Sequence, residues 1–248
     1  MVSIKTQEEI ELMAKSGEIL AKIMRELKAR VKPGITTKEL DKLAEELIFS
    51  YKAKPAFKGY NGFPFVLCSS INEQIVHGVP SGRELIEGDI LSLDFGVIYH
   101  GFYSDMAITL PIGSINPEAN RLIRVTKKAL KRAIARVKPG KTIGDIGQAI
   151  ENYIDGQGFK VVRDLCGHGI GKQLHEKPDV LNFGKRHKGL ELKPRMVLAL
   201  EPMAVMGNPG IKKGPDGFCY QTADNSLSAH FEHTVAVTEK GPRILTSS

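Results

Sequence analysis

The chain has 248 residues and a formal net charge of +7 at pH 7. Its hydrophobic content of 42% and charged content of 25% are those of a folded globular protein, which excludes disordered and fibrous classes. No apolar run in the sequence approaches the length of a membrane span. The basic residues are spread over helix-like segments such as Arg121–Lys138, so we expect solvated helix faces and no sequence-specific nucleic-acid partner.

The first residues and the cysteines predict the compartment. The N-terminal segment contains no short apolar core of a signal peptide and passes directly into an amphipathic helical pattern. Cys68, Cys166 and Cys219 lie far apart, in no spacing typical of a zinc site or a redox pair. They are read as reduced thiols in a reducing compartment, so we expect a cytoplasmic protein.

An internal duplication organises the sequence. The segment Arg30–Gly34 (RVKPG) recurs about 106 residues later as Arg136–Gly140, and helical patterns precede and follow both copies. In each copy a Lys-Pro-Gly stop is followed by a threonine that can cap a helix. These signals predict helices over Thr37–Ser50 and Ile143–Gln157.

The same shift aligns two predicted strands, Ile90–Asp94 and Val197–Glu201, whose apolar runs each end in a carboxylate. Such a residue makes a buried polar contact or builds a site, because a lone buried charge is costly. Strands at equivalent repeat positions would face each other across a pseudo-twofold axis. We therefore predict one α+β domain over residues 1–248, with halves of roughly 1–110 and 111–248, a central antiparallel sheet and outer helices.

A predicted hairpin carries the first candidate site residues. The segment Asp94–Asp105 contains a turn signal at Tyr99–Gly101, and a symmetric turn there places Asp94 and Asp105 directly opposite each other on one face. Two carboxylates so close repel each other unless a cation or a proton lies between them. The alternative for this segment alone is a pair of solvent-facing aspartates on an edge hairpin.

Further candidate residues lie in the second half. His168 and His175 stand in a glycine-rich segment that predicts loop and short strand, without the lysine and hydroxyl ending of a phosphate-binding loop. Glu201 follows an apolar run, and Glu232 lies in a strand rich in β-branched residues near the C-terminus. Each signal is weak alone, but together they supply a set of metal-binding side chains that the duplication can bring to one face.

Taken together, these motifs closely resemble those of the type I methionine aminopeptidases. The resemblance rests on the aspartate hairpin, GHGIG with the following HE, LEPM at Leu200–Met203 and SAHFEHT at Ser228–Thr234, in the order and spacing of that family. It covers nearly the whole chain. It implies the pita-bread fold, which is internally duplicated, with a central antiparallel sheet, outer helices and pseudo-twofold symmetry.

The resemblance implies a site for two divalent metal ions. Its ligands would be Asp94, Asp105, His168, Glu201 and Glu232. Asp105 and Glu232 would bridge both ions, Asp94 would serve one, and His168 and Glu201 would serve the other. Two such ions and four carboxylates are close to neutral only when the metals are bound. Oxygen-rich coordination with one imidazole fits cobalt, manganese or iron and leaves zinc open.

The resemblance also implies catalytic and substrate-binding residues. Glu201 would carry a proton from the attacking water to the leaving amine, and His77 and His175 would hydrogen-bond the substrate and the oxyanion. For His77 alone, a structural histidine before a turn is an equal alternative. The methionine pocket would be lined by Phe57, Tyr60, Phe63, Cys68, Leu174 and Phe218. Positions 57, 174 and 218 depart from the cysteine, phenylalanine and tryptophan of well-known bacterial relatives, which changes the pocket shape.

The implied function is removal of the initiator methionine from nascent polypeptides whose second residue is small. We expect a cytoplasmic monomer that associates transiently with the ribosome and has no membrane partner. One alternative is a Xaa-Pro peptidase of the same fold, which usually carries a large additional N-terminal domain. The other is a non-catalytic pita-bread binding protein that has lost its metals, a reading that the five ligands disfavour. The absence of the long insertion of type II enzymes favours type I.

Overall fold

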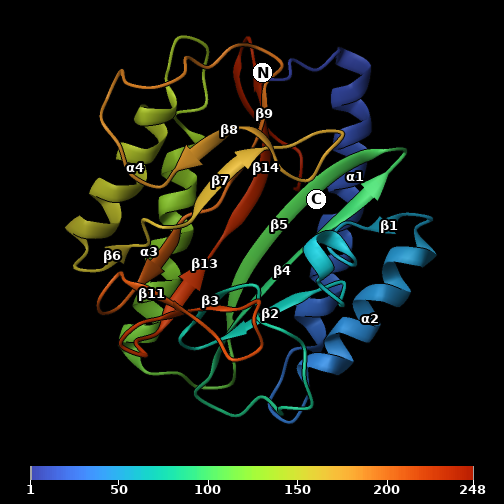
Figure 1. Cartoon of the computed structure of the whole chain (residues 1–248), viewed down its shortest axis with the longest axis vertical. Coiled ribbons are helices and arrows are strands. Elements are labelled where there is room, and N and C mark those ends of the chain that lie inside the picture. Colours follow the sequence, from blue (N-terminus) through green and yellow to red (C-terminus); the bar gives the residue numbers. More distant parts are fainter. Residues whose placement is uncertain (1, 248) are drawn as a thin grey trace.

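The computed structural model describes residues 2–247 of the chain (Figure 1). Its helices are α1 (Gln7–Arg30), α2 (Thr37–Ser50), α3 (Pro117–Ile134), α4 (Ile143–Gly156) and the short 3-10 helix η1 (Tyr60–Gly62). Its strands are β1 (Lys54–Pro55), β2 (Cys68–Ile71), β3 (Gln74–Val76), β4 (Ile90–Tyr99), β5 (Phe102–Pro111), β6 (Lys160–Val161), β7 (Cys166–Gly169), β8 (Glu176–Leu181), β9 (Val197–Leu200), β10 (Met203–Val205), β11 (Ile211–Lys213), β12 (Tyr220–Thr222), β13 (Ser228–His230), β14 (Glu232–Thr238) and β15 (Gly241–Ile244). Among the residues described, no helix combines the length and the apolarity that crossing a bilayer requires.

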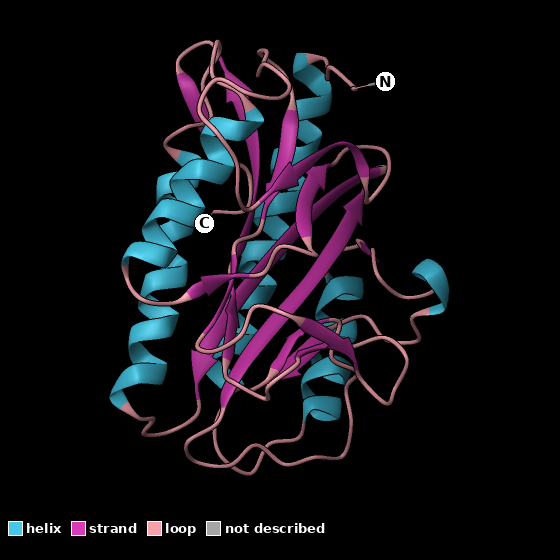
Figure 2. Ribbon diagram, turned by 60° about the vertical axis from the view of Figure 1, so that its left-hand side comes forward, coloured by secondary structure: helices cyan, strands magenta, loops and turns pink. Residues whose placement is uncertain are grey.

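A nine-stranded antiparallel sheet forms the middle of the molecule. Its main path has the order β1-β4-β5-β14-β9-β7-β8, with β2 beside β4 and β15 beside β14. Two three-stranded sheets, β13-β10-β6 and β11-β12-β3, complete the strands. The long helices lie alongside the strands (Figure 2). The expected α+β architecture, with an antiparallel sheet inside and helices outside, is confirmed.

The two halves repeat one construction. Thr36 and Thr142 each form a capping box at the start of the second helix of their half, and they form equivalent isolated bridges to Glu84 and Glu191. The strands β2, β4 and β5 of the first half correspond to β7, β9 and β14 of the second. The predicted second helices are confirmed as α2 and α4, and α4 ends at Gly156, one residue before the predicted end.

Each half has its own apolar core between its helices and its strands. In the first half this cluster includes the fully buried Leu20, Leu40 and Phe95. In the second half it includes Ile146 and Leu198. Because burying one such side chain stabilises a fold by about 1.5–3 kcal/mol, two separate cores can hold both halves firmly. The seam between the halves is therefore free to carry polar residues.

The seam between the halves is the junction of β5 and β14, whose backbones pair at only two positions. On one side of this short ladder, Thr234 Oγ1 accepts a hydrogen bond from the Asp105 N–H and donates one to the Asp105 carbonyl, each at 2.9 Å. On the other side, Thr109 Oγ1 makes the same two contacts with the backbone of His230, at 2.9 and 2.8 Å. The two threonines thus replace ladder bonds symmetrically and fix the polar residues of the seam.

The β4–β5 hairpin has a different register from the one the sequence predicts. Its two-residue turn is His100–Gly101, with φ of 48° and 82°, and this places Asp94 opposite Ala107 and Asp105 opposite Gly96. The expectation that the two aspartates stand directly opposite each other is wrong. They share one face as diagonal neighbours, because the turn occupies His100–Gly101, one residue later than the Tyr99–His100 turn that would place Asp94 opposite Asp105.

Candidate metal and substrate site

One cavity, of about 160 Å³, brings together every residue that the sequence indicates for the site, and adds Asn61. The lining residues are Phe57, Tyr60, Asn61, Phe63, Cys68, His77, Asp94, Asp105, His168, Leu174, His175, Glu201, Phe218 and Glu232. They come from both halves of the chain, so the duplication does bring them to one place.

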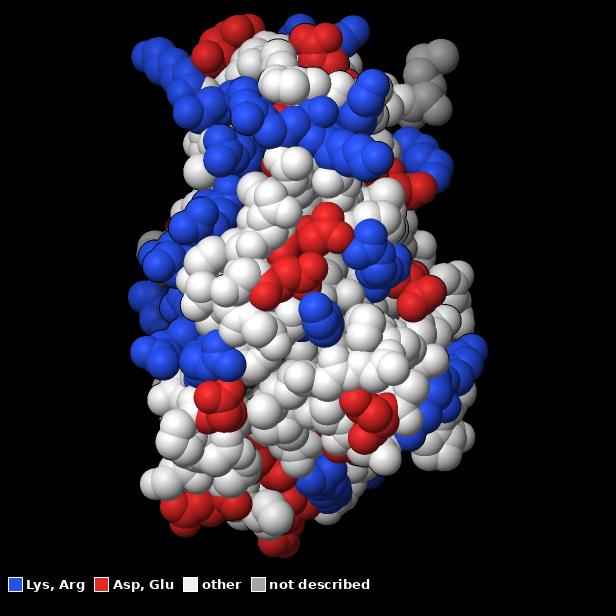
Figure 3. Space-filling model, turned by 90° about the vertical axis from the view of Figure 1, so that its left-hand side faces the viewer, with Lys and Arg blue, Asp and Glu red and all other residues white. Residues whose placement is uncertain are grey.

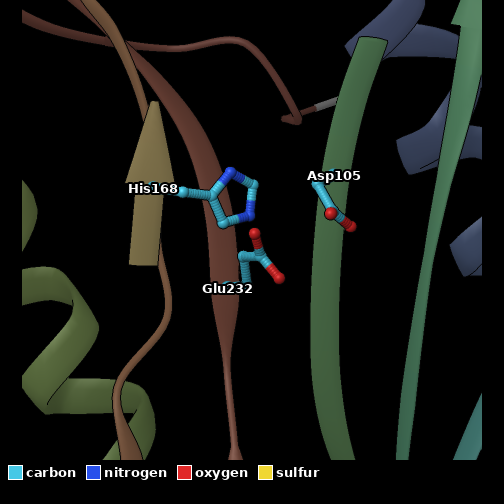
Figure 4. A group of neighbouring side chains, drawn as sticks. All are labelled: Asp105, His168 and Glu232. Atoms are coloured by element: carbon cyan, nitrogen blue, oxygen red, sulfur yellow. The ribbon is translucent and has the colours of Figure 1, made fainter. Parts of the chain in front are cut away.

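Strands of the central sheet position the polar end of the cavity. Asp94 lies on β4, Asp105 on β5 and His168 on β7, while Glu201 directly follows β9 and Glu232 begins β14. Ligand atoms of Asp105, His168 and Glu232 lie within 4.8 Å of one another. Figure 4 shows these three side chains directed into the same space from separate strands. The arrangement is the size of a single-ion site with further carboxylates beside it.

Burial raises the pKa of all four carboxyl groups. Loss of hydration raises the pKa of Asp105 to about 7. The pKa values of Asp94, Glu201 and Glu232 lie well above their ordinary range, mainly through burial and then through repulsion by neighbouring carboxylates. Within residues 2–247, Asp94 Oδ1 and Glu232 Oε1 have no hydrogen-bond partner. Such groups need protons or cations close by, and the set therefore fits divalent metal ions.

His168 is held in the form that binds a metal. Its Nδ1 lies 2.9 Å from the Gly169 carbonyl oxygen, so Nδ1 carries the proton and donates it there. The lone pair of Nε2 then faces Glu201, whose Oε1 is 3.6 Å away. Burial lowers the pKa of His168 to about 3, which keeps the ring neutral. A neutral imidazole whose orientation is fixed by a backbone carbonyl is a typical metal ligand.

His230 is a residue to which the sequence analysis assigned no role. It is 1% exposed, and neither ring nitrogen has a hydrogen-bond partner in the described part of the chain. Its Nε2 lies 3.7 Å from Glu201 Oε2 and 3.9 Å from Glu232 Oε2. The three side chains form a second group that could hold an ion. The signal for it was its place two residues before Glu232 in the SAHFEHT motif.

Two neutral histidines, His77 and His175, line the same cavity. His77 follows β3 with φ of 58°, a conformation that non-glycine residues seldom adopt. Burial lowers the pKa of His77 to about 4 and shifts that of His175 in the same direction. His175 Nδ1 lies 2.7 Å from the hydroxyl oxygen of Tyr60, and its ring centroid lies 4.2 Å from that of His168. Both rings can therefore hydrogen-bond a ligand beside the carboxylates.

Apolar side chains form the other end of the cavity. Phe63 and Phe218 pack edge to face, with ring centroids 5.4 Å apart. Phe218 comes from the β11–β12 hairpin, and β12 pairs with β3 of the other half. Cys68 pairs with Asp94 across β2 and β4, and burial raises the pKa of its thiol well above the ordinary range. An apolar wall next to a carboxylate cluster suits a substrate with one long apolar side chain near a polar reacting bond.

Comparison with known proteins places the chain in a family. The model of metallopeptidase family M24 matches residues 11–239, so the chain belongs to that family. Within it, the chain is 48% identical to a methionine aminopeptidase of Clostridium perfringens and 44% identical to methionine aminopeptidase 1 of Bacillus subtilis, in each case covering 99% of both chains. The crystal structure of methionine aminopeptidase from Thermotoga maritima matches with a TM-score of 0.98 at 41% identity and covers 100% of both chains. The chain groups with the methionine aminopeptidases of family M24.

The fold is shared more widely than the group. Prolidase from Pyrococcus furiosus matches with a TM-score of 0.78 at 26% identity, and the chain covers 65% of that structure. The expected pita-bread fold is therefore confirmed. The Xaa-Pro peptidase alternative is disfavoured, because the methionine aminopeptidases match with higher identity over their full length.

Proposed function

We propose that this chain hydrolyses the peptide bond after the N-terminal methionine of nascent polypeptides whose second residue is small. One observation carries the proposal: a single cavity joins a buried cluster of carboxylates and His168 to an apolar wall. The full-length similarity to methionine aminopeptidases supports the same activity. Metal-dependent hydrolysis is consistent with membership of the M24 family.

We propose that two divalent ions are held by Asp94, Asp105, His168, Glu201 and Glu232. When bound, such ions supply a Lewis acid for the scissile carbonyl and a water of lowered pKa. The buried, unpartnered carboxylate oxygens support this assignment. The donor set is rich in oxygen with one imidazole, which fits cobalt, manganese or iron and leaves zinc open. Metal analysis of anaerobically purified protein decides between them.

The proposed chemical steps use three side chains. Glu201 takes a proton from the attacking water and delivers it to the leaving amine, a role supported by the raised pKa of its buried carboxyl group. His77 and His175 donate hydrogen bonds to the substrate and to the developing oxyanion, which their neutral rings allow. Tyr60 supports His175 through the 2.7 Å contact with Nδ1.

We propose that the methionine side chain occupies the apolar end of the cavity. Its walls would be Phe57, Tyr60, Phe63, Cys68, Leu174 and Phe218. Aromatic edges pack well against a thioether, and the limited volume excludes a larger substrate side chain. We also propose that residues 1–248 act as one catalytic domain and as a monomer, since one chain supplies all of the proposed site residues from its two halves.

Peptide hydrolysis with manganese or cobalt added tests the activity. We expect Met-Gly, Met-Ala and Met-Ser peptides to be cleaved well, and Met-Lys, Met-Arg and Met-Phe peptides poorly. Release of leucine or phenylalanine while methionine peptides stay intact would overturn the proposal. Cleavage of Xaa-Pro dipeptides alone would identify the alternative peptidase, and tight peptide binding without hydrolysis would identify a binding protein.

The charge distribution supports a ribosome partner, which we propose as transient. Residues 121–144 contain nine Lys or Arg and no Asp or Glu, and residues 185–188 add three more cations. The rest of the chain has 23 cations and 28 carboxylates, so its net charge is −5. The expectation that the cations are dispersed is wrong, because the 185–188 loop folds onto the start of α4 through the bond from the Gly144 N–H to the Lys188 carbonyl. Figure 3 shows the basic band on this side of the molecule. A groove there is lined by Arg132, Arg136, Lys138 and Arg186.

Cosedimentation with ribosomes in the cytoplasm's salt range tests this partner. We expect Arg132→Glu with Arg136→Glu to weaken binding and reduce its salt dependence, because phosphate contacts release counterions. The control reverses two exposed lysines on other helices, Lys28 and Lys42. Equal loss in the control would mean that overall charge, and not this groove, attracts the ribosome. The free cysteines Cys68, Cys166 and Cys219 support our proposal of a cytoplasmic location.

A further inference from the structure

A buried lysine at the start of the chain reaches the loop that carries His175. Lys5 precedes α1, is 3% exposed, and its Nζ lies 2.6 Å from Glu176 Oε2. Every other lysine or arginine that forms an ion pair within residues 2–247 has a side chain at least 37% exposed. Buried ion pairs are costly to form, so this contact requires an explanation beyond surface solubility.

Glu176 is the residue after His175 and organises the turn before it. Its Oε2 pairs with Lys5, while its Oε1 accepts the backbone N–H groups of Lys172 and Gln173 at 2.8 and 3.2 Å. One carboxylate therefore closes the turn internally and attaches it to the N-terminal segment. The segment is itself anchored, because the Lys5 N–H donates to the Arg195 carbonyl at 3.0 Å.

A glycine in the turn leaves the room that Lys5 occupies. A Cβ atom at Gly171 would lie 2.4 Å from Lys5 Cε and 2.6 Å from Lys5 Nζ. It would also lie 2.7 Å from Glu176 Oε1. The absence of a side chain at Gly171 therefore makes room for the Lys5 side chain. Lys5 and its ion-pair partner Glu176 are 171 positions apart in the sequence.

His175 is therefore constrained from two directions. On its imidazole side, Tyr60 contacts Nδ1, and on its backbone side the turn is held by Glu176. Ser3, in the same N-terminal segment as Lys5, lines a cleft of about 610 Å³ that reaches both His168 and His175. The N-terminal segment lies next to the proposed catalytic site and is not a distant extension.

We propose that Lys5 is a positioning residue, which holds the 170–176 turn so that His175 meets the substrate. The inference rests on the proposed role of His175 in hydrolysis. Without the ammonium group, the carboxylate of Glu176, which is only 14% exposed, would lose its counter-ion and would move towards water, taking the turn with it. Misplacement of a catalytic group by about 1 Å can lower a rate by roughly 100-fold.

The test is a double-mutant cycle with Lys5→Met and His175→Ala. The methionine keeps most of the lysine side chain, is one atom shorter and removes the charge. With metal saturating, we expect K5M to lower kcat by roughly 10- to 100-fold and to change KM by less than about threefold. Metal stoichiometry should stay unchanged. In the H175A background, K5M should cost less than about twofold, because the two residues act through one group. Glu176→Gln should repeat the pattern of K5M and provides a second variant if K5M folds poorly.

Arg243→Met is the matched control, because Arg243 also forms an ion pair with the N-terminal part of the chain, at Glu11 in α1. We expect its kcat to stay within about twofold of the original protein. A normal kcat in K5M, metal loss in K5M, or full additivity of K5M with H175A would each overturn the inference.

Hydrogen exchange of the 170–176 segment separates this inference from the proposed function. The amide hydrogens of Lys172 and Gln173 should exchange faster in K5M than in the original protein, and their exchange rates should be unchanged in R243M. This expectation does not depend on the substrate. If the original protein cleaves no methionine peptide but these amides exchange faster in K5M, the proposed function is wrong, whereas the role of Lys5 in holding the 170–176 turn is supported. If exchange is unchanged in K5M and the original protein hydrolyses methionine peptides normally, only the proposed role of Lys5 is wrong.

Discussion

The β4–β5 hairpin and the β9–β14 pair place equivalent carboxylates through different connections. In the first half, a two-residue turn joins the strands, and they pair at ten positions from Ile90 to Pro111. In the second half, the strands β10 to β13 intervene between the equivalent strands, which pair at only four positions. Local turn geometry therefore sets the first pair, whereas the second depends on contacts made elsewhere in the fold.

The difference shows how one half of a duplicated frame can acquire selectivity. Asp94 on β4 corresponds to Glu201 directly after β9, and each half adds one more carboxylate, Asp105 on β5 or Glu232 on β14, so both halves supply proposed metal ligands. The intervening segment of the second half supplies Phe218, which has no counterpart in the first half, on the apolar wall. It also supplies His230 beside the carboxylates. The comparison assigns metal binding to the shared frame and substrate discrimination to the insertion.

The largest expected effect tests the shared frame. Asp105→Ala and Glu232→Ala each remove one of the two proposed bridging ligands, one from each half, so each should lower kcat/KM by about 1,000-fold or more and reduce bound metal. Metal analysis and peptide hydrolysis on the same samples measure both losses. Glu118→Ala, an exposed carboxylate on α3, is the control and should change neither. Near-normal turnover in either variant would break the equivalence of the two halves and the two-metal assignment.

A smaller effect is expected at His230, which lies at the end of β13 in the intervening segment of the second half. If its N–H steadies the Glu201 or Glu232 carboxylate, His230→Leu should lower metal affinity or activity by roughly 10- to 100-fold, as for other groups that orient metal ligands. His230→Gln keeps a donor and should retain most of both. Calorimetric titration of manganese into each variant, together with kcat, gives the measurement. Equal behaviour of the two variants would leave His230 without this role.

The sequence predicted the site where the signals were local. The carboxylates and histidines of the cavity stand in short motifs, and the helix caps at Thr36 and Thr142 follow from neighbouring residues. The turn of the hairpin was mispredicted by one residue, which shifts the strand pairing by two, because the turn depends on the left-handed conformation of His100, which sequence alone does not fix. A shift of the turn by one residue moves every cross-strand pair.

Contacts between distant segments account for what the sequence left out. The Lys5–Glu176 pair joins residues 171 positions apart, and no periodicity links them. The basic groove of α3 and α4 includes Arg186 of the 185–188 loop, which contacts the start of α4 only in the folded chain. Asn61 lines the cavity from η1 with φ of 47°, a conformation that its sequence neighbours do not require. Such features follow from packing and not from local pattern.

The smallest expected effect concerns stability without metal, and its sign follows from the raised pKa of Asp105. Burial raises this pKa to about 7 in the fold, whereas an ordinary aspartate in the unfolded chain titrates near 3.9. Between about pH 4 and pH 7 the metal-free folded state therefore holds a proton that the unfolded state lacks. The stabilisation is complete below the unfolded pKa and is lost as the pH rises through 7.

Metal-free protein should consequently be less stable at pH 7.5 than at pH 5.5, by about 2 kcal/mol from Asp105 alone, which corresponds to roughly 4–8 °C in Tm for a chain of this size. Asp94, Glu201 and Glu232 shift in the same direction and add to the loss. Bound metal ions take the place of the protons, so the holoprotein should not show this loss, and added manganese should restore Tm by binding the folded state. Melting curves of holo and chelator-treated protein at both pH values, with metal content measured, give the comparison.

The variant Asp105→Asn is the control, because its side chain cannot ionise and it should reduce the pH dependence of the metal-free form. If the gap between holo and metal-free Tm is equal at the two pH values, the carboxylates of the two halves are too well solvated to act as one cluster.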